Sequence, residues 1–212
     1  MILTGVTKRY RRGAETVIAV DDVSVEIGPG LTVIVGPSGS GKTTLLNLVV
    51  GWELPDEGTV VRASEPAGAP PGSRPDWNRL AIVPQSLGLL DELSVGENVS
   101  LPARFGATQH VATARMLEHL GLDGLAERLP SETSLGEQQR TSLARALCTR
   151  PAILLADEPT SHQDEANTMV IVDELAAAAT GGASVLVATH DPRVITRSST
   201  VLHLLDGRLV ER

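Results

Sequence analysis

The stretch GPSGSGKT, residues 36–43, decides the fold of this chain. It fits the pattern G-x-x-x-x-G-K-[ST], it follows the apolar run LTVIVG (31–36), and it opens the helix-length segment GKTTLLNLVVG (41–51). In such a strand–loop–helix unit, glycines let backbone N–H groups wrap a polyphosphate, and the helix N-terminus adds its positive dipole end. The flanking patterns disfavour a chance glycine-rich turn. The residues expected to bind the phosphates are Gly36, Pro37, Ser38, Gly39, Ser40, Gly41, Lys42, Thr43 and Thr44, with Lys42 on the β- and γ-phosphates and Thr43 on Mg²⁺.

Two carboxylates follow another buried-strand pattern. ILLADE (153–158) places Asp157 and Glu158 at the end of an apolar run. In a phosphate-loop fold the first acid holds Mg²⁺, directly or through water. Glu158 would then polarise the attacking water, a general-base role worth roughly 10²–10⁴ in rate. A solvated strand end is the alternative, and the presence of the phosphate loop disfavours it.

Two further polar residues end apolar strand patterns. His190 closes SVLVATH (184–190), where it could touch the γ-phosphate and orient a water; a structural histidine is the alternative. Gln85 closes LAIVPQ (80–85), where its amide could reach Mg²⁺ or water. An ordinary turn glutamine explains the residue equally well from the sequence alone.

Composition narrows the class of protein. The chain has 212 residues with 42% apolar content, which favours one globular domain over residues 1–212. Its net charge of −8 argues against a nucleic-acid partner or direct binding to an anionic membrane. The single cysteine, Cys148, excludes an internal disulfide and fits a core position in a reducing compartment. Neither a signal-peptide pattern nor an apolar run of about 18 residues occurs, so we expect a cytoplasmic protein without direct membrane insertion.

In the middle of the chain the sequence pattern changes from one typical of strands to one typical of helices. Capping boxes at Ser94/Glu97 and Ser134/Glu137 predict two helix starts, the second helix running to Cys148. Residues 108–120 predict a further helix, with Val111, Ala114, Leu117 and Leu120 on one face and Gly121 closing it. We therefore expect a mainly helical insert over about 86–150. A Pro- and Gly-rich loop is expected over 63–76.

Strand patterns surround this helical part. They are expected at VDDVSVEI (20–27), GTVVRA (58–63), AILLAD (152–157) and in the terminal hairpin VLHLLDGRLVE (201–211), which turns at Asp206–Gly207. A helix over 164–179 separates two of the apolar strands. This alternation predicts an α/β fold with a mainly parallel core sheet and an antiparallel β part.

The order of these motifs resembles the ATP-binding cassette (ABC) family of phosphate-loop NTPases over essentially the whole chain. Phosphate loop, Gln85, SLGEQQR (134–140), ILLADEPT (153–160), SHQD (161–164) and ATHD (188–191) follow one another in that family's order. ENVSLP (97–102), GEQQR and ADEPT further resemble its lipoprotein-release, macrolide-efflux and cell-division subfamily. The resemblance implies a single ABC ATPase domain, in which a helical subdomain over about 86–150 is inserted in a RecA-like core. It also implies an ATPase that uses ATP and Mg²⁺ and powers a separate membrane-spanning permease subunit, to which it is attached at the inner face of the cell membrane.

The resemblance also implies roles for individual residues. Tyr10 would stack on adenine, and Gln85 would sense Mg²⁺ and link the site to the helical subdomain. In a homodimer or paired cassette, the signature segment (residues 133–137) would offer Ser134, Gly136 and Glu137 to the ATP held by the other copy. Asp164 would belong to the loop that communicates across the dimer. The surface around residues 86–100 would dock the membrane partner.

Two departures from the family pattern leave an alternative open. The usual Leu-Ser-Gly-Gly-(Gln/Glu) reads here Thr133, Ser134, Leu135, Gly136, Glu137, and SHQD places His162 and Gln163 where small residues are usual. Leucine at a helix start is locally better than glycine by up to about 1 kcal/mol, but its side chain could hold the backbone away from a phosphate. The alternative function is a nucleotide-dependent scaffold or signalling cassette with little hydrolysis.

Overall fold

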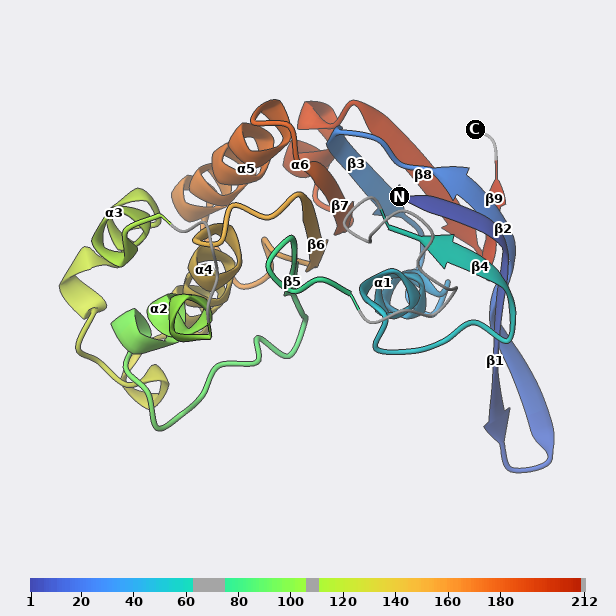
Figure 1. Cartoon of the computed structure of the whole chain (residues 1–212), viewed down its shortest axis with the longest axis horizontal. Coiled ribbons are helices and arrows are strands. Elements are labelled where there is room, and N and C mark those ends of the chain that lie inside the picture. The colour runs from blue at the N-terminus through green and yellow to red at the C-terminus, as the bar shows by residue number, and fades with distance from the viewer. Residues whose placement is uncertain (63–74, 106–110, 211–212) are drawn as a thin grey trace.

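A computed structural model describes residues 1–62, 75–105 and 111–210 of the chain. The described strands form two sheets (Figure 1). The smaller is antiparallel, in the order β2-β1-β4, and its β1–β2 hairpin extends to the lower right of the view. Its strands are β1 (Ile2–Arg12), β2 (Glu15–Glu26) and β4 (Glu57–Val61).

The larger sheet has the order β5-β6-β7-β3-β8-β9. Its strands pair in parallel except for β8 and β9, which pair antiparallel across the turn at Asp206–Gly207. Both turn residues have positive φ, 46° and 79°, as the expected two-residue hairpin requires. The strands are β3 (Gly30–Val35), β5 (Leu80–Val83), β6 (Ile153–Asp157), β7 (Ser184–Ala188), β8 (Thr200–Leu205) and β9 (Arg208–Val210). The predicted α/β fold with a mainly parallel core sheet and an antiparallel part is confirmed.

Alternate residues along the central strands enter two different cores. On β6, Ile153 and Leu155 join the cluster that contains helix α1 (Lys42–Val50) and the three-stranded sheet. Leu154 and Ala156, on the opposite face, join the cluster that contains the other helices. Because side chains alternate across a strand, a continuous apolar run such as ILLA is what a sheet buried on both faces requires.

Helices between β5 and β6 occupy the left side of Figure 1. Both predicted capping boxes are present, at Ser94 with Glu97 and at Ser134 with Glu137. The elements are α2 (Val95–Arg104), α3 (Thr113–His119), the short 3₁₀ helices η1 (Asp123–Leu125) and η2 (Pro130–Glu132), and α4 (Leu135–Leu147). A helical segment thus occupies the predicted 86–150 range; its treatment as a separate subdomain stays a prediction.

The helix expected over 108–120 is shorter than the sequence pattern predicts. Within the described residues it begins at Thr113, and Ala114 is exposed whereas Met116 is buried. The predicted face is therefore wrong at Ala114, because the large side chains of Met116, Leu117 and Leu120 set which side faces α4. Residues 108–110 and most of the expected 63–76 loop lie outside the described residues.

Two helices complete the fold on the face of the large sheet that carries Leu154 and Ala156. Helix α5 (Glu165–Thr180) confirms the expected helix over 164–179, with Asp164 as its N-cap. Helix α6 (Pro192–Arg197) was not expected from the sequence pattern. In the described part of the chain, no helix is long and apolar enough to cross a membrane.

Candidate nucleotide site

The phosphate loop (residues 36–43) connects β3 to α1, as the motif requires. Gly41 is the N-cap of α1 with φ 103°, and a Cβ there would lie 2.1 Å from the carbonyl oxygen of Ala19. A side chain at this position is therefore excluded by both conformation and space. The Lys42 ammonium donates to the carbonyls of Gly36 at 2.8 Å and Pro37 at 3.1 Å, which holds it over the loop.

A buried hydroxyl in this loop lacks a partner. Ser40 is 2% exposed, and its Oγ is the buried side-chain polar atom without a hydrogen bond among the described residues. Leaving such a group unsatisfied costs about 1–3 kcal/mol. Gly39, with φ 81°, has open space where a Cβ would be. The loop thus combines room beside its backbone with the Lys42 ammonium, which suits an oxygen-rich anion such as a polyphosphate.

Thr43 and Asp157 meet at the edge of the large sheet. The Thr43 hydroxyl donates to Asp157 Oδ2 at 2.6 Å, which joins the first turn of α1 to the end of β6. Burial raises the pKa of the Asp157 carboxyl; the Thr43 hydrogen bond opposes this shift and the neighbouring Glu158 charge adds to it. A hydroxyl and a carboxylate are oxygen ligands that suit Mg²⁺, which in nucleotide sites takes one or two carboxylates plus phosphate oxygens. These residues therefore fit the metal.

Glu158 is held by two polar neighbours from the end of β7. Thr189 donates to its Oε2 at 3.0 Å, and Nδ1 of His190 lies 3.1 Å from its Oε1. Glu158 itself has φ 48°, an uncommon backbone conformation for a residue other than glycine. Such local strain persists only where the surroundings over-determine it, and it is concentrated at functional sites. The carboxylate is fixed at the same sheet edge as Asp157.

These groups surround one cavity of about 610 Å³. Most of the predicted residues line it, whereas Ser40 lies buried beneath the loop. Sequence reasoning gave no site role to Ala19, Ser161 or Thr189; Ser161 begins SHQD, and Thr189 precedes His190 in ATHD, so the motifs themselves held the signal. The lining residues are Ala19, Gly36, Pro37, Ser38, Gly39, Gly41, Lys42, Thr43, Thr44, Gln85, Asp157, Glu158, Ser161 and His190.

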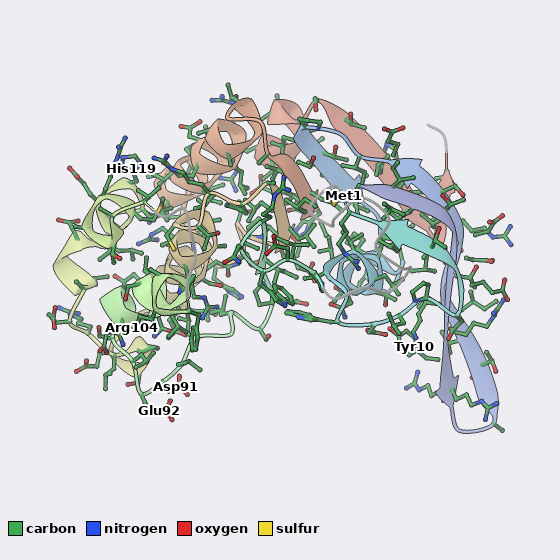
Figure 2. The ribbon with its side chains drawn as sticks, in the orientation of Figure 1. Met1, Tyr10, Asp91, Glu92, Arg104 and His119 are labelled. Carbon is green, nitrogen blue, oxygen red and sulfur yellow. The ribbon has the colours of Figure 1, made fainter. Side chains whose placement is uncertain are left out.

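Tyr10 does not line this cavity. In Figure 2 it lies between α1 and the β1–β2 hairpin. Its hydroxyl donates to Glu53, and burial together with that carboxylate raises the pKa of Tyr10 to about 12, while a hydrogen bond with Thr44 opposes the rise. Tyr10 thus lies next to Thr44, which directly follows the phosphate loop, and the tyrosine is 37% exposed. Its stacking on adenine stays a prediction.

Ser134, Gly136 and Glu137 also lie outside the cavity, at the start of α4. Glu137 Oε2 accepts two hydrogen bonds from Ser134, one from its hydroxyl and one from its backbone amide at 2.7 Å. These hydrogen bonds lower the pKa of Glu137, against the opposing effect of burial. The signature segment therefore does not reach the phosphate loop of its own chain.

Helix α4 connects this segment to both sides of the site. Gln139 donates to the Glu158 carbonyl at 3.0 Å. One turn later, Ser142 donates to the carbonyl of Leu87 at 2.8 Å, which holds the backbone two residues after Gln85. A single helix thus fixes the segments that carry Glu158 and Gln85.

Comparison with known proteins decides the family. The model of the ABC transporter family matches residues 20–161, a span that includes the phosphate loop, Gln85, the signature segment and Glu158. The chain belongs to the ABC transporter family. The resemblance drawn from the order of the motifs is thus confirmed, and the family is one of ATPases. The assignment of this cavity as the nucleotide site stays a prediction.

Curated relatives of this ABC cassette cover its whole length. The lipoprotein-releasing system ATP-binding protein LolD of Paramagnetospirillum magneticum is 39% identical over 99% of this chain and 96% of its own. LolD of Gluconobacter oxydans is 38% identical over 98% and 94%. The macrolide export ATP-binding/permease protein MacB of Burkholderia thailandensis is 35% identical over 98% of this chain but only 33% of its own length.

Solved ABC cassettes share the fold. The dimeric post-hydrolysis structure of the cassette MJ0796, bound to ADP and Pi, superposes with a TM-score of 0.89 at 30% identity, over 99% of this chain and 96% of that one. A second dimeric structure of MJ0796 gives 0.87 at 31% identity. Two related cassettes in one assembly are thus a known arrangement for this fold.

Proposed function

We propose that this cassette is the ATP-hydrolysing subunit of a membrane complex, in which two copies close around ATP and drive a separate membrane-spanning permease subunit. The observation that carries the proposal is the convergence of Lys42, Thr43, Asp157, Glu158 and His190 on one cavity. The dimeric MJ0796 structures and the permease function in the name of MacB support the assembly.

Each residue at the cavity has a role in this proposal. Lys42 and the backbone amides of the phosphate loop bind the β- and γ-phosphates. A bound Mg²⁺ would supply positive charge that neutralises the phosphates. Thr43 and Asp157 would hold it, with Gln85 beside them. Glu158 accepts a proton from the attacking water, and His190 orients the water and contacts the γ-phosphate.

The second copy would complete the site. Ser134, Gly136 and Glu137 of one cassette would face the γ-phosphate bound by the other, with Asp164 at the interface. ATP then favours the closed dimer because it contacts both copies only there. Loss of the γ-phosphate releases that contact, so hydrolysis opens the dimer. The position of the signature segment outside its own cavity supports this arrangement.

The permease would dock on residues 86–100, which places the cassette at the inner face of the cell membrane through its partner. Asn98 shapes this surface: it is fully buried, accepts from the Leu90 amide at 2.9 Å, and donates to the carbonyls of Leu90, Leu93 and Ser94. The segment that it holds presents Asp91 and Glu92 outward, at the lower edge of Figure 2. An acidic rim of this kind suits a partner surface that carries basic residues.

Steady-state ATP turnover against protein concentration tests the proposal. A turnover rate that rises faster than linearly, requires Mg²⁺ and disappears in Glu158→Gln supports a catalytic homodimer. Tight ATP binding with negligible turnover would instead support the nucleotide-dependent scaffold. The transported substrate would be selected by the membrane subunit; the relatives named above are assigned to lipoprotein release and macrolide export.

A further inference from the structure

The SHQD loop (residues 161–164) contacts the signature segment of its own chain. Gln163 Nε2 donates to the Gly136 carbonyl at 2.9 Å. The same side-chain amide accepts from Arg140 Nη1 at 2.8 Å through its Oε1. One side chain of the loop therefore uses both ends of its amide on the first two turns of α4.

A buried side chain and close packing fix this contact between the SHQD loop and α4. Arg140 is 7% exposed, and its Nε donates to the Leu120 carbonyl at 2.9 Å, which fixes the guanidinium that holds Gln163. A Cβ at Gly136 would lie 2.9 Å from the His162 carbonyl oxygen and 3.3 Å from the Gln163 amide. The glycine is thus required by the loop of its own chain, independently of any phosphate. His162 adopts φ 62°, the left-handed conformation that brings its carbonyl there.

The loop is also continuous with the catalytic carboxylate. Glu158 lies five residues before Gln163 along the chain, and its carbonyl accepts from Gln139 of the same helix. The start of α4 is therefore tied twice to the segment 158–163, by Gln139 at one end and by Gln163 at the other. A displacement of the signature segment must move or break at least one of these ties.

We propose that Gln163 is a positioning residue that holds the signature segment at a fixed place relative to Glu158 of the same chain. It acts through Gly136 and Arg140 and touches no nucleotide bound by its own copy. This inference rests on the proposed function, because a positioned signature segment matters for ATP held by a second copy. When Gln163 is present, the start of α4 is already in place, so less of it has to be reordered when ATP closes the dimer.

Substitutions at Gln163 distinguish its hydrogen bond to the Gly136 carbonyl from its hydrogen bond with Arg140. Gln163→Glu keeps the shape and the acceptor for Arg140 but replaces the donor to the Gly136 carbonyl with a carboxylate oxygen. Gln163→Leu removes both hydrogen bonds at similar volume. His162→Asn is the matched control, since it changes the adjacent exposed side chain, tolerates the left-handed backbone conformation of residue 162, and leaves the Gln163 amide in place.

Hydrogen exchange of the nucleotide-free protein is the first readout. We expect backbone amides of residues 135–140 to exchange about tenfold faster in both Gln163 variants, as the loss of one or two hydrogen bonds implies. The His162→Asn control should match wild type. The second readout is ATP-driven dimerisation in a Glu158→Gln background, which keeps ATP intact. We expect the ATP concentration at half-maximal dimer to rise about tenfold, while the affinity of the monomer for a fluorescent ATP analogue stays unchanged.

Unchanged exchange at residues 135–140 would overturn the proposal, whatever the dimer does. Faster exchange with an unshifted ATP dependence would overturn the link to closure, because the contact would then be only structural. If the Glu158→Gln protein with native Gln163 does not dimerise with ATP, the proposed homodimer fails, and the exchange measurement alone decides whether Gln163 positions the segment.

Discussion

Nδ1 of His190 lies 3.1 Å from Oε1 of Glu158, yet the two side chains differ sharply in exposure. The histidine ring is 85% exposed, whereas the glutamate is 18% exposed. A largely buried carboxylate is therefore oriented by a ring that faces solvent in the single chain. Such an arrangement gives Glu158 a fixed direction and leaves the ring free to contact a phosphate.

Glu158→Gln should lower ATP turnover by about 10²–10⁴, since the amide cannot accept the proton of the attacking water. ATP affinity should stay near that of wild type, because Lys42 and the phosphate loop are intact. His190→Ala should lower turnover less, because it removes orientation and retains the base. Single-turnover hydrolysis with a separate binding titration checks both; equal losses in the two variants would contradict the assignment of the base.

Asp157→Asn should stabilise the nucleotide-free protein at neutral pH. The pKa of the folded Asp157 lies above its unfolded value because the group is buried. Between the pKa of Asp157 in the unfolded chain and its higher pKa in the folded protein, the folded state therefore binds more protons. The free energy of unfolding falls as the pH rises through this range. Removal of the charge should raise Tm by about 2–4 °C at pH 7, roughly 1 kcal/mol.

This gain should shrink as the pH is lowered, because the buried Asp157 carboxyl, with its raised pKa, is protonated before the carboxyl of the unfolded chain. Thermal unfolding from pH 4 to 8 without Mg²⁺ measures it, with the exposed Asp91→Asn as the control. An Asn variant that is less stable than wild type at pH 7 would contradict the prediction. Activity should fall in the same variant, since the amide is a poorer ligand for Mg²⁺.

Cys148 should react slowly with thiol reagents in the folded protein. It is 2% exposed, and burial raises the pKa of its thiol to about 11, against the opposing charge of Arg145. Because the thiolate is the reactive form, labelling at pH 8 should be at least about 100-fold slower than in denaturant. As the chain has one cysteine, mass spectrometry reads the rate directly; fast labelling of the native protein would show that the helices around Cys148 open readily.

Leu135→Gly should cost stability and leave turnover close to wild type. Leu135 is the first residue of α4, is 46% exposed and does not line the cavity of its own chain. Glycine there should lower stability by up to about 1 kcal/mol, or about 2–4 °C in Tm. Steady-state turnover and thermal unfolding measure the two effects.

Leu135→Ala is the matched control, since it removes the bulk of the side chain and keeps the helix propensity. A wild type that is nearly silent, with turnover restored by both substitutions, would show that the leucine holds the partner's phosphate away. The scaffold alternative would then replace the proposed catalytic cycle.

Local patterns predicted most of the elements. Both capping boxes and the Asp206–Gly207 turn were readable because each depends on residues close together in the chain. Helix α6 was missed although its N-cap Asp191 and Pro192 are ordinary start signals, because six residues give too few turns for a periodic pattern. The predicted buried face of α3 was wrong at Ala114, because packing against α4, and not the periodicity of the sequence, set the orientation of this helix.

The sequence by itself determined the chemistry of the site. The phosphate loop, the carboxylates after β6 and the histidine after β7 each carry their signal in a short segment, and parallel strands bring their carboxyl ends to one edge. Only the tertiary structure decided how the helical segment is tied to that edge. The hydrogen bonds from Gln139 to Glu158 and from Gln163 to Gly136 span 19 and 27 residues. No local pattern specifies them, because they depend on which face of α4 packs against the SHQD loop.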